Sequence, residues 1–181
     1  MVRFVVVLAG ALVLAACLEG TAAPDEAPFS GSAGSLELLG KEVLHALSRE
    51  DTLALERFRL TEEKHNRVVW PELPAADPQA NYPVDFAWSN IQMRNARALS
   101  RLLPLFAGTD PMFEAVGCRG GTRAFETFRV HTDCWIRFTL PHRPGTLEVQ
   151  VFKDVLVRAG GFKVFRYYGE PPRPVHAEGG R

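Results

Sequence analysis

The sequence predicts an α+β domain whose helices come first and whose antiparallel strands follow. Before residue 104, apolar side chains recur at the three- and four-residue spacing of helices, whereas from Pro111 onward they alternate with polar ones. Two pairs of turn residues, Pro144-Gly145 and Gly160-Gly161, divide the alternating part into strands. Because helices and strands are segregated along the chain, we expect the helices to pack on one face of a curved meander sheet.

Three helices are expected first. The stretch from Ser35 to Arg49 is amphipathic, with Ser35 as N-cap and an apolar stripe formed by Leu36, Leu39, Val43, Leu44 and Leu47. Asp51 is placed to cap a short second helix, and Thr61 a third over residues 62–69. Pro71 and Pro74 then interrupt helical structure.

A longer helix should open at Pro83 or Asp85 and end near Pro104 or Gly108. One face of this helix carries Trp88, Ile91, Ala98, Leu99 and Leu102. Three basic residues fall off that face: Arg94, Arg97 and Arg101. We therefore expect the apolar face to join the core and the arginines to stay outside it.

Four strands are expected, at residues 111–118, 130–140, 146–157 and 161–168. Alternation assigns to the helix-covered face Cys134, Ile136, Phe138, Leu140, Leu147, Val149, Val151, Val155, Val157, Phe162 and Val164. Three less apolar side chains share that parity: Lys153, Arg166 and Tyr168.

These three residues, with Trp88 from the long helix, are candidates for binding a ligand. A cation on an apolar face must reach water, a counter-charge or an anionic ligand. Two ordinary alternatives stay open: strand ends that emerge from under the helices with their stems reaching solvent, and a Trp88 that is a core or lid residue.

The opposite face of the sheet is mixed. It carries an aromatic and apolar cluster that predicts a contact surface for a second copy or an envelope protein: Trp135, Phe152, Leu156, Phe165 and Tyr167. The alternative is scattered surface aromatics shielded by arginine stems. His131 and Asp133 are also placed on this face, where we expect a solvated or interface-lining pair rather than an acid–base dyad, and no catalytic residue is assigned.

The N-terminus has the pattern of a bacterial lipoprotein signal. Arg3 precedes an eleven-residue apolar run, too short to span a bilayer, which leads into Leu14-Ala15-Ala16-Cys17. The pattern predicts cleavage before Cys17 and acylation of that residue, which makes the lipid bilayer a partner. Leu18 stands where inner-membrane lipoproteins commonly carry Asp, which favours the periplasmic face of the outer membrane. An ordinary secretory signal is the alternative.

With Cys17 acylated, two cysteines remain, Cys118 and Cys134. In an oxidising compartment we expect one disulfide between them, with two buried free thiols as the alternative. No CxxC or paired-histidine spacing occurs, so neither a metal nor a cofactor is expected.

The domain boundaries follow from composition. Residues 1–16 are the signal, 17–34 a flexible tether, 35–170 the folded domain and 171–181 a disordered tail. The precursor has 21 basic and 21 acidic residues and no basic stripe, which argues against nucleic acid as a partner.

Two patches, Val69-Trp70-Pro71-Glu72-Leu73-Pro74 and Asp85-Phe86-Ala87-Trp88, together with the element order, resemble the nuclear-transport-factor-2-like (ketosteroid-isomerase-like, cystatin-like) superfamily over residues 35–170. That family usually inserts a strand or hairpin among its helices, and only residues 70–84 could supply one. The resemblance implies a cone-like fold and leaves function open. The sequence favours a non-enzymatic envelope lipoprotein that binds a ligand or protein, and the alternative is a small isomerase- or hydrolase-like enzyme.

Overall fold

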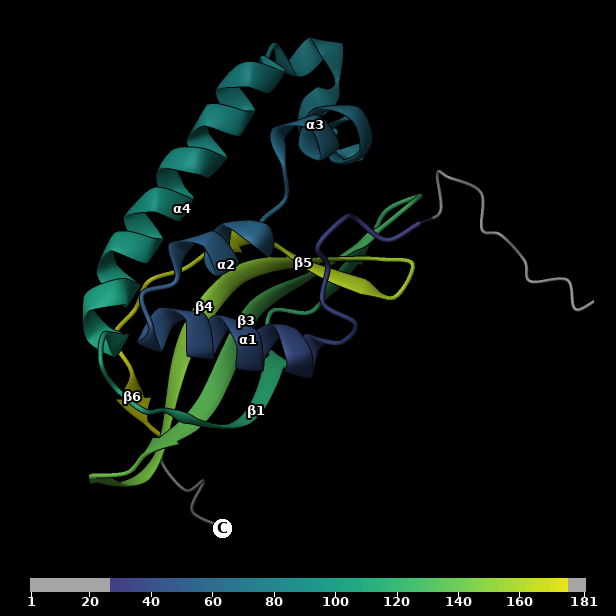
Figure 1. The fold of residues 1–181 in the computed structure, drawn as a ribbon. Helices are drawn as coiled ribbons and strands as arrows, with labels where there is room; N and C mark the ends of the chain where they lie inside the picture. The colour runs from purple at the N-terminus through teal and green to yellow at the C-terminus, as the bar shows by residue number, and fades with distance from the viewer. Residues whose placement is uncertain (1–26, 176–181) are drawn as a thin grey trace, which may run out of the picture.

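The structure, a computed structural model, describes residues 27–175 and confirms the α+β class. Helices precede an open antiparallel sheet in the order β1-β3-β4-β5, with short β2 beside β3 and β6 beside β4. Helix α1 (Leu36–Ser48) lies across the sheet, α2 (Thr52–Arg57) lies above it, and the long α4 (Val84–Phe106) rises along one side (Figure 1).

The three predicted N-caps are confirmed. The Ser35 hydroxyl accepts from the Leu38 amide at 3.0 Å, and the Asp51 carboxylate accepts from the Ala54 amide at 3.0 Å. Thr61 caps α3 (Glu62–Lys64), which continues as a π-helical turn, η1 (His65–Val69). Side-chain acceptors at these positions satisfy amides that the helix itself cannot pair, so each helix begins where the sequence places it.

The proline-rich segment before α4 forms no strand. It consists of three 3₁₀ turns, η2 (Trp70–Glu72), η3 (Pro74–Ala76) and η4 (Pro78–Ala80). The Glu72 carboxylate accepts from the Thr127 backbone amide at 3.1 Å, which ties this segment to the chain ahead of β3. Proline in the first turn of each such element loses no hydrogen bond, which explains why three turns form here in succession.

The strands extend over β1 (Met112–Cys118), β2 (Thr122–Ala124), β3 (Arg129–Leu140), β4 (Arg143–Arg158), β5 (Gly161–Tyr167) and β6 (Arg173–Pro174). Both predicted turns are displaced. Leu140 pairs with Arg143, so the β3–β4 turn precedes Pro144-Gly145. At the β4–β5 turn the two residues with positive φ are Ala159 and Gly160, one position earlier than predicted.

The main core lies between α1 and the sheet. It contains the predicted α1 stripe residues Leu39, Val43, Leu44 and Leu47, and the strand residues Ile136, Phe138, Leu147, Val149 and Val155. These side chains are almost fully buried, so each of them contributes hydrophobic stabilisation to the fold.

Three separate segments protect β5, which ends the main strand order. Ala33 exchanges backbone hydrogen bonds with Phe162, and residues 58 and 60 do so with Val164. Farther along, the buried amide of Asn95 on α4 accepts from the Tyr167 backbone amide at 2.7 Å and donates to the Phe165 carbonyl. A single asparagine thus replaces a neighbouring strand and fixes α4 beside the sheet.

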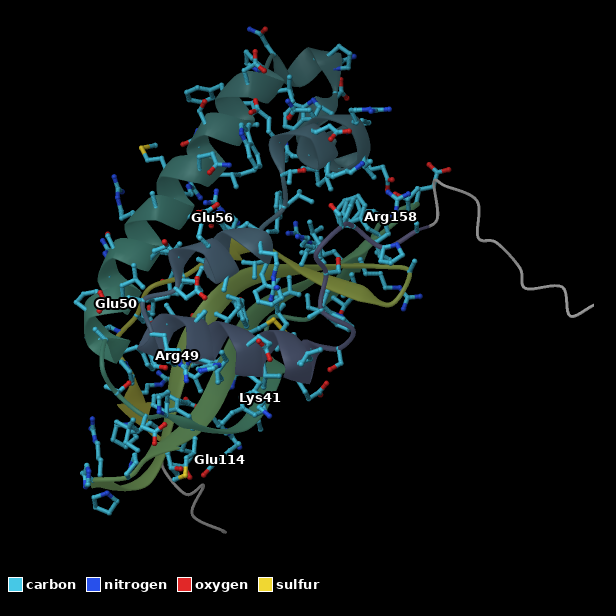
Figure 2. The ribbon with its side chains drawn as sticks, viewed as in Figure 1. Lys41, Arg49, Glu50, Glu56, Glu114 and Arg158 are labelled. Atoms are coloured by element: carbon cyan, nitrogen blue, oxygen red, sulfur yellow. A yellow bond between two sulfur atoms is a disulfide. The ribbon has the colours of Figure 1, made fainter. Side chains whose placement is uncertain are left out.

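The predicted tether and tail are both too long. Phe29 and Ala33 are buried, and the Arg158 guanidinium lies 5.3 Å from the centre of the Phe29 ring. Figure 2 labels Arg158. At the other end, Arg173 and Pro174 pair with β4. Both segments fold because they cover sheet edges or apolar surface that the domain would otherwise expose. The remaining predicted parts, residues 1–26 and 176–181, lie outside the described residues.

The predicted faces hold at one end of the sheet and fail at the other. Ile136 and Phe138 face α1 as expected. The β3–β4 register shifts between Cys134 and Trp135, where the extra residue belongs to β4, and the β4–β5 register shifts on both sides of Asp154. Asp133 of β3 has a φ of 53°. Each extra residue reverses the parity of the strand beyond it. Past these irregularities a second apolar core covers the reverse face and is formed by Phe29, Leu60, Val69, Phe128, Val130 and Leu156.

Candidate functional site

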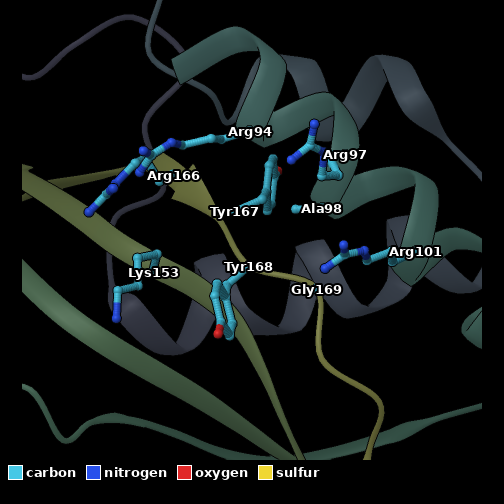
Figure 3. A pocket seen from close by; sticks show the side chains of 9 residues that line it. All are labelled: Arg94, Arg97, Ala98, Arg101, Lys153, Arg166, Tyr167, Tyr168 and Gly169. Carbon is cyan, nitrogen blue, oxygen red and sulfur yellow. The ribbon is translucent and has the colours of Figure 1, made fainter. Parts of the chain in front are cut away.

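A cavity of about 200 Å³ lies between α4 and the end of β5 (Figure 3). Helix α4 contributes Arg94, Arg97, Ala98 and Arg101, and the strands contribute Lys153, Arg166, Tyr167, Tyr168 and Gly169. Three of the four residues predicted to bind a ligand therefore meet here. The α4 arginines complete the site. Their three- and four-residue spacing places them on one side of the helix, but it does not show which segment that side meets.

Close packing forms the floor of the cavity. A Cβ atom on Gly169 would lie 2.7 Å from the Ala98 carbonyl oxygen, so only glycine lets the chain leave β5 so near α4. The buried Tyr167 hydroxyl donates to the Leu55 carbonyl at 2.9 Å. Burial raises the pKa of the Tyr167 phenol, which stays neutral and serves as a rigid wall.

Two of the five cations at the cavity have carboxylate partners. Lys153 Nζ lies 2.5 Å from Asp133 Oδ1, and Arg166 pairs with the buried Asp154. Among residues 27–175 no carboxylate pairs with the other three, Arg94, Arg97 and Arg101. Arg94 extends from α4 toward Arg166 (Figure 3). The cavity therefore carries an excess of positive charge.

Tyr168 borders this cation cluster. The Lys153 ammonium lies 5.6 Å from the centre of the Tyr168 ring, a cation–π distance. The Tyr168 hydroxyl donates to Glu170 at 3.0 Å, and this hydrogen bond raises the pKa of the phenol. Tyr168 is thereby held as a neutral aromatic group at the cavity mouth.

Asp133 of β3, whose φ is 53°, lies against the site through its ion pair with Lys153. Its carboxylate accepts from Lys153 and from Gln150, the latter at 2.8 Å, and the Lys153 bond lowers the pKa of Asp133. A Cβ on Gly120 would lie 2.5 Å from Asp133 Oδ2, so this close approach requires glycine. His131 instead lies 2.7 Å from the Thr122 hydroxyl, and His131 and Asp133 form no dyad.

Trp88 lies away from the cavity and is a core residue, which corrects its prediction as a ligand platform. Its ring is 5.1 Å from that of His65, which also contacts Trp70 and Phe165. Burial lowers the pKa of His65, whose Nε2 has no hydrogen-bond partner. Helix α4 places Trp88 against His65 rather than at the cavity.

The predicted contact surface on the outer face is not formed. Phe152 and Tyr167 belong to the main core, Leu156 to the second core, and Phe165 packs against that second core. The strand irregularities explain the error, since they turn two of these side chains inward, and the segment 61–80 covers the others. Trp135 belongs to neither core and stays partly exposed.

Trp135 belongs to a second arginine cluster, which sequence alone did not reveal. The Arg119 and Arg173 guanidinium groups lie 4.8 Å and 4.3 Å from the Trp135 ring centre. Both also bind the carboxylate of Glu148, with Arg137 Nε at 3.8 Å, and these bonds, that of Arg119 first, lower the pKa of Glu148. Three arginines thus share one buried carboxylate.

The disulfide is confirmed. Cys118 of β1 and Cys134 of β3 stand directly opposite each other and are bonded. The other predicted site residue at a cysteine, Cys17, lies outside the described residues.

Within residues 27–175, no helix has the length and apolar character to cross a bilayer, and no group of three His, Cys, Asp or Glu side chains is placed to hold a metal ion. Comparison with protein families, curated proteins and solved structures finds no match for this chain. The resemblance to the cone-like superfamily therefore stays a prediction.

Proposed function

We propose that the chain is a lipid-anchored protein of the bacterial envelope whose folded domain binds an anionic ligand between α4 and β5. The observation that carries the proposal is the set of α4 arginines that face one cavity without a carboxylate partner among the described residues. Guanidinium groups are suited to phosphate and carboxylate ligands because they donate several hydrogen bonds in a fixed plane.

The residues around the cavity favour binding over catalysis. Its lining contains neither a carboxylate nor an imidazole that could accept a proton at neutral pH. Its two tyrosines have raised pKa values, the result of burial at Tyr167 and of the Glu170 hydrogen bond at Tyr168. The cavity can therefore hold a negative charge, and its lining offers the enzyme alternative no general base.

The anion site is tested by thermal unfolding of the mature chain in phosphate and in chloride at equal ionic strength. Phosphate should raise the melting temperature, because a ligand that binds only the folded state stabilises it. The triple variant R94Q/R97Q/R101Q should lose this increase. The matched control R49Q/R123Q/R143Q, which removes three exposed arginines elsewhere, should keep it.

Asp133→Asn should increase the phosphate effect, since it releases Lys153 from its carboxylate. Asparagine tolerates the positive φ at this position. No phosphate effect in the wild type, or an equal loss in the matched control, contradicts the anion site.

The anchor is tested separately in a bacterial host that processes lipoproteins. The full chain should incorporate labelled palmitate and sediment with membranes, and Cys17→Ser should abolish both. Leu18→Asp should move the protein from outer to inner membrane fractions. A chain that is exported and cleaved but unlabelled would show that the signal is an ordinary secretory one.

A further inference from the structure

A second cavity, of about 210 Å³, continues the first along α4 toward its N-terminus. It is lined by Tyr82, Ala87, Asn90, Ile91 and Phe165, and it shares Arg94 and Arg166 with the first cavity. Because they share two lining residues, the two cavities adjoin each other along α4, and we refer to the pair as the groove. Along α4 this groove extends from Ala87 to Arg101, about 21 Å at ~1.5 Å per residue.

The two ends of the groove differ in chemistry. The end near Arg101 is cationic, because the α4 arginines gather there. At the other end, the polar amide of Asn90 already donates to the Tyr82 hydroxyl at 3.1 Å, which leaves aromatic and aliphatic surface. Tyr82 is 39% exposed and lies edge-on to Phe86, which is 57% exposed. Apolar surface left open beside arginines without a carboxylate partner suits an occupant that has both characters.

We propose that this groove binds a single-chain amphiphile with a phosphate head group. The phosphate lies among Arg94, Arg97 and Arg101, and the apolar chain extends over Ile91 and Phe165 toward Tyr82. The inference rests on the proposed anion site and adds the class of ligand. A phosphate dianion matches several guanidinium groups better than a carboxylate does. The two cavities together, about 410 Å³ from 200 and 210 Å³, lie within the ~300–1,000 Å³ typical of small-molecule sites.

The test is calorimetric titration of the mature chain with methyl, butyl, hexyl and octyl phosphate below their micellar concentrations. Affinity should rise with chain length, by up to about fourfold for each CH₂ that becomes buried, which corresponds to ~0.8 kcal/mol. Octyl glucoside, which has the same chain and no charge, should bind far more weakly than octyl phosphate.

Variants separate the two ends of the groove. Tyr82→Ser and Ile91→Ser should flatten the chain-length dependence and leave methyl phosphate binding unchanged. Met93→Ser is the matched control, because Met93 is 53% exposed on the same helix and lines neither cavity. Thermal unfolding without ligand checks that Ile91→Ser stays folded, and the exposed Tyr82 gives a second variant with little risk to the fold.

The outcomes distinguish the inference from the function on which it rests. If methyl phosphate binds and longer chains bind no better, the anion site stands and the amphiphile is excluded. If no alkyl phosphate binds, the anion site itself fails. Equal affinity for octyl glucoside and octyl phosphate shows nonspecific adsorption of the chain and overturns the inference.

Discussion

The two arginine clusters of this domain differ in what balances their charge. Around Glu148, only 5% exposed, three arginines of the outer sheet face share one carboxylate. Along α4, Arg94, Arg97 and Arg101 meet no carboxylate within residues 27–175. Arginines that pair with a carboxylate of the same fold support its structure, whereas arginines without such a partner are available to a ligand.

The largest expected effect is at Glu148. Glu148→Gln keeps the shape and removes the charge, so the free energy of unfolding should fall by about 2 kcal/mol, the scale of hydrogen bonds to charged groups. Urea denaturation at pH 7 measures it. Arg137→Gln is the control and should cost under ~0.5 kcal/mol, because Arg137 is half-exposed and lies 3.8 Å from the carboxylate.

Glu148→Gln should also change how the stability of the protein depends on pH. The pKa of Glu148 is lowered in the folded state, so its contribution is present above the unfolded pKa of ~4.3 and is lost as the pH falls through the folded pKa. The difference between wild type and Glu148→Gln should therefore shrink on acidification below ~4.3. A difference that stays constant would show that the Glu148 charge contributes nothing.

An intermediate effect is expected at Lys163, a third kind of cation. It is 2% exposed and donates to the carbonyls of Arg57 and Arg59 at 2.5 and 3.1 Å, and burial, aided by repulsion from Arg57, lowers its pKa to about 8. Between the folded value and the unfolded ~10.4, the unfolded chain binds more protons. Stability should thus rise with pH from ~8 to ~9.5, by at most ~1.4 kcal/mol per pH unit.

Lys163→Met should remove this rise, measured as the difference between the two urea stabilities at each pH. The range ends at ~9.5 because the buried Tyr167, with its raised pKa, destabilises the fold once unfolded tyrosine ionises near pH ~10. Parallel pH profiles for the two proteins would mean that Lys163 carries its charge without cost.

The smallest effect is expected for the open cluster itself. R94Q/R97Q/R101Q should change the free energy of unfolding by less than ~0.5 kcal/mol in ligand-free buffer, and in the stabilising direction at low salt, since like charges three and four residues apart on a helix repel. A loss comparable to that of Glu148→Gln would break the comparison and assign the α4 arginines a structural role.

The correct and the incorrect sequence predictions lie in different parts of the chain. Ser35, Asp51 and Thr61 predicted the helix starts correctly, because a cap is a local interaction over three residues. Alternation predicted the α1-facing side of Ile136 and Phe138, whose pairing with Val149 and Leu147 is regular. It failed beside the register shifts of β4, where an extra residue reverses the parity of the strand.

For the candidate site, the pattern singled out Lys153, Arg166 and Tyr168 as exceptions on an apolar face, and they do line one cavity. The sequence did not predict that the α4 arginines form the other wall of this cavity. Which face of α4 meets β5 is decided by Asn95, whose amide pairs with the strand edge about 70 residues away. That contact, rather than any local pattern, turns the arginines toward the cavity.

The sequence by itself determined the order and approximate limits of the helices and main strands, the pairing of Cys118 with Cys134 and the residues that break the apolar pattern. These depend on local hydrogen bonding, on period and on counting. Only the tertiary structure decided which carboxylate meets which cation, because bulges and edge contacts set the relative positions of distant segments. For that reason Glu148 closes one arginine cluster, and the cluster along α4 stays open.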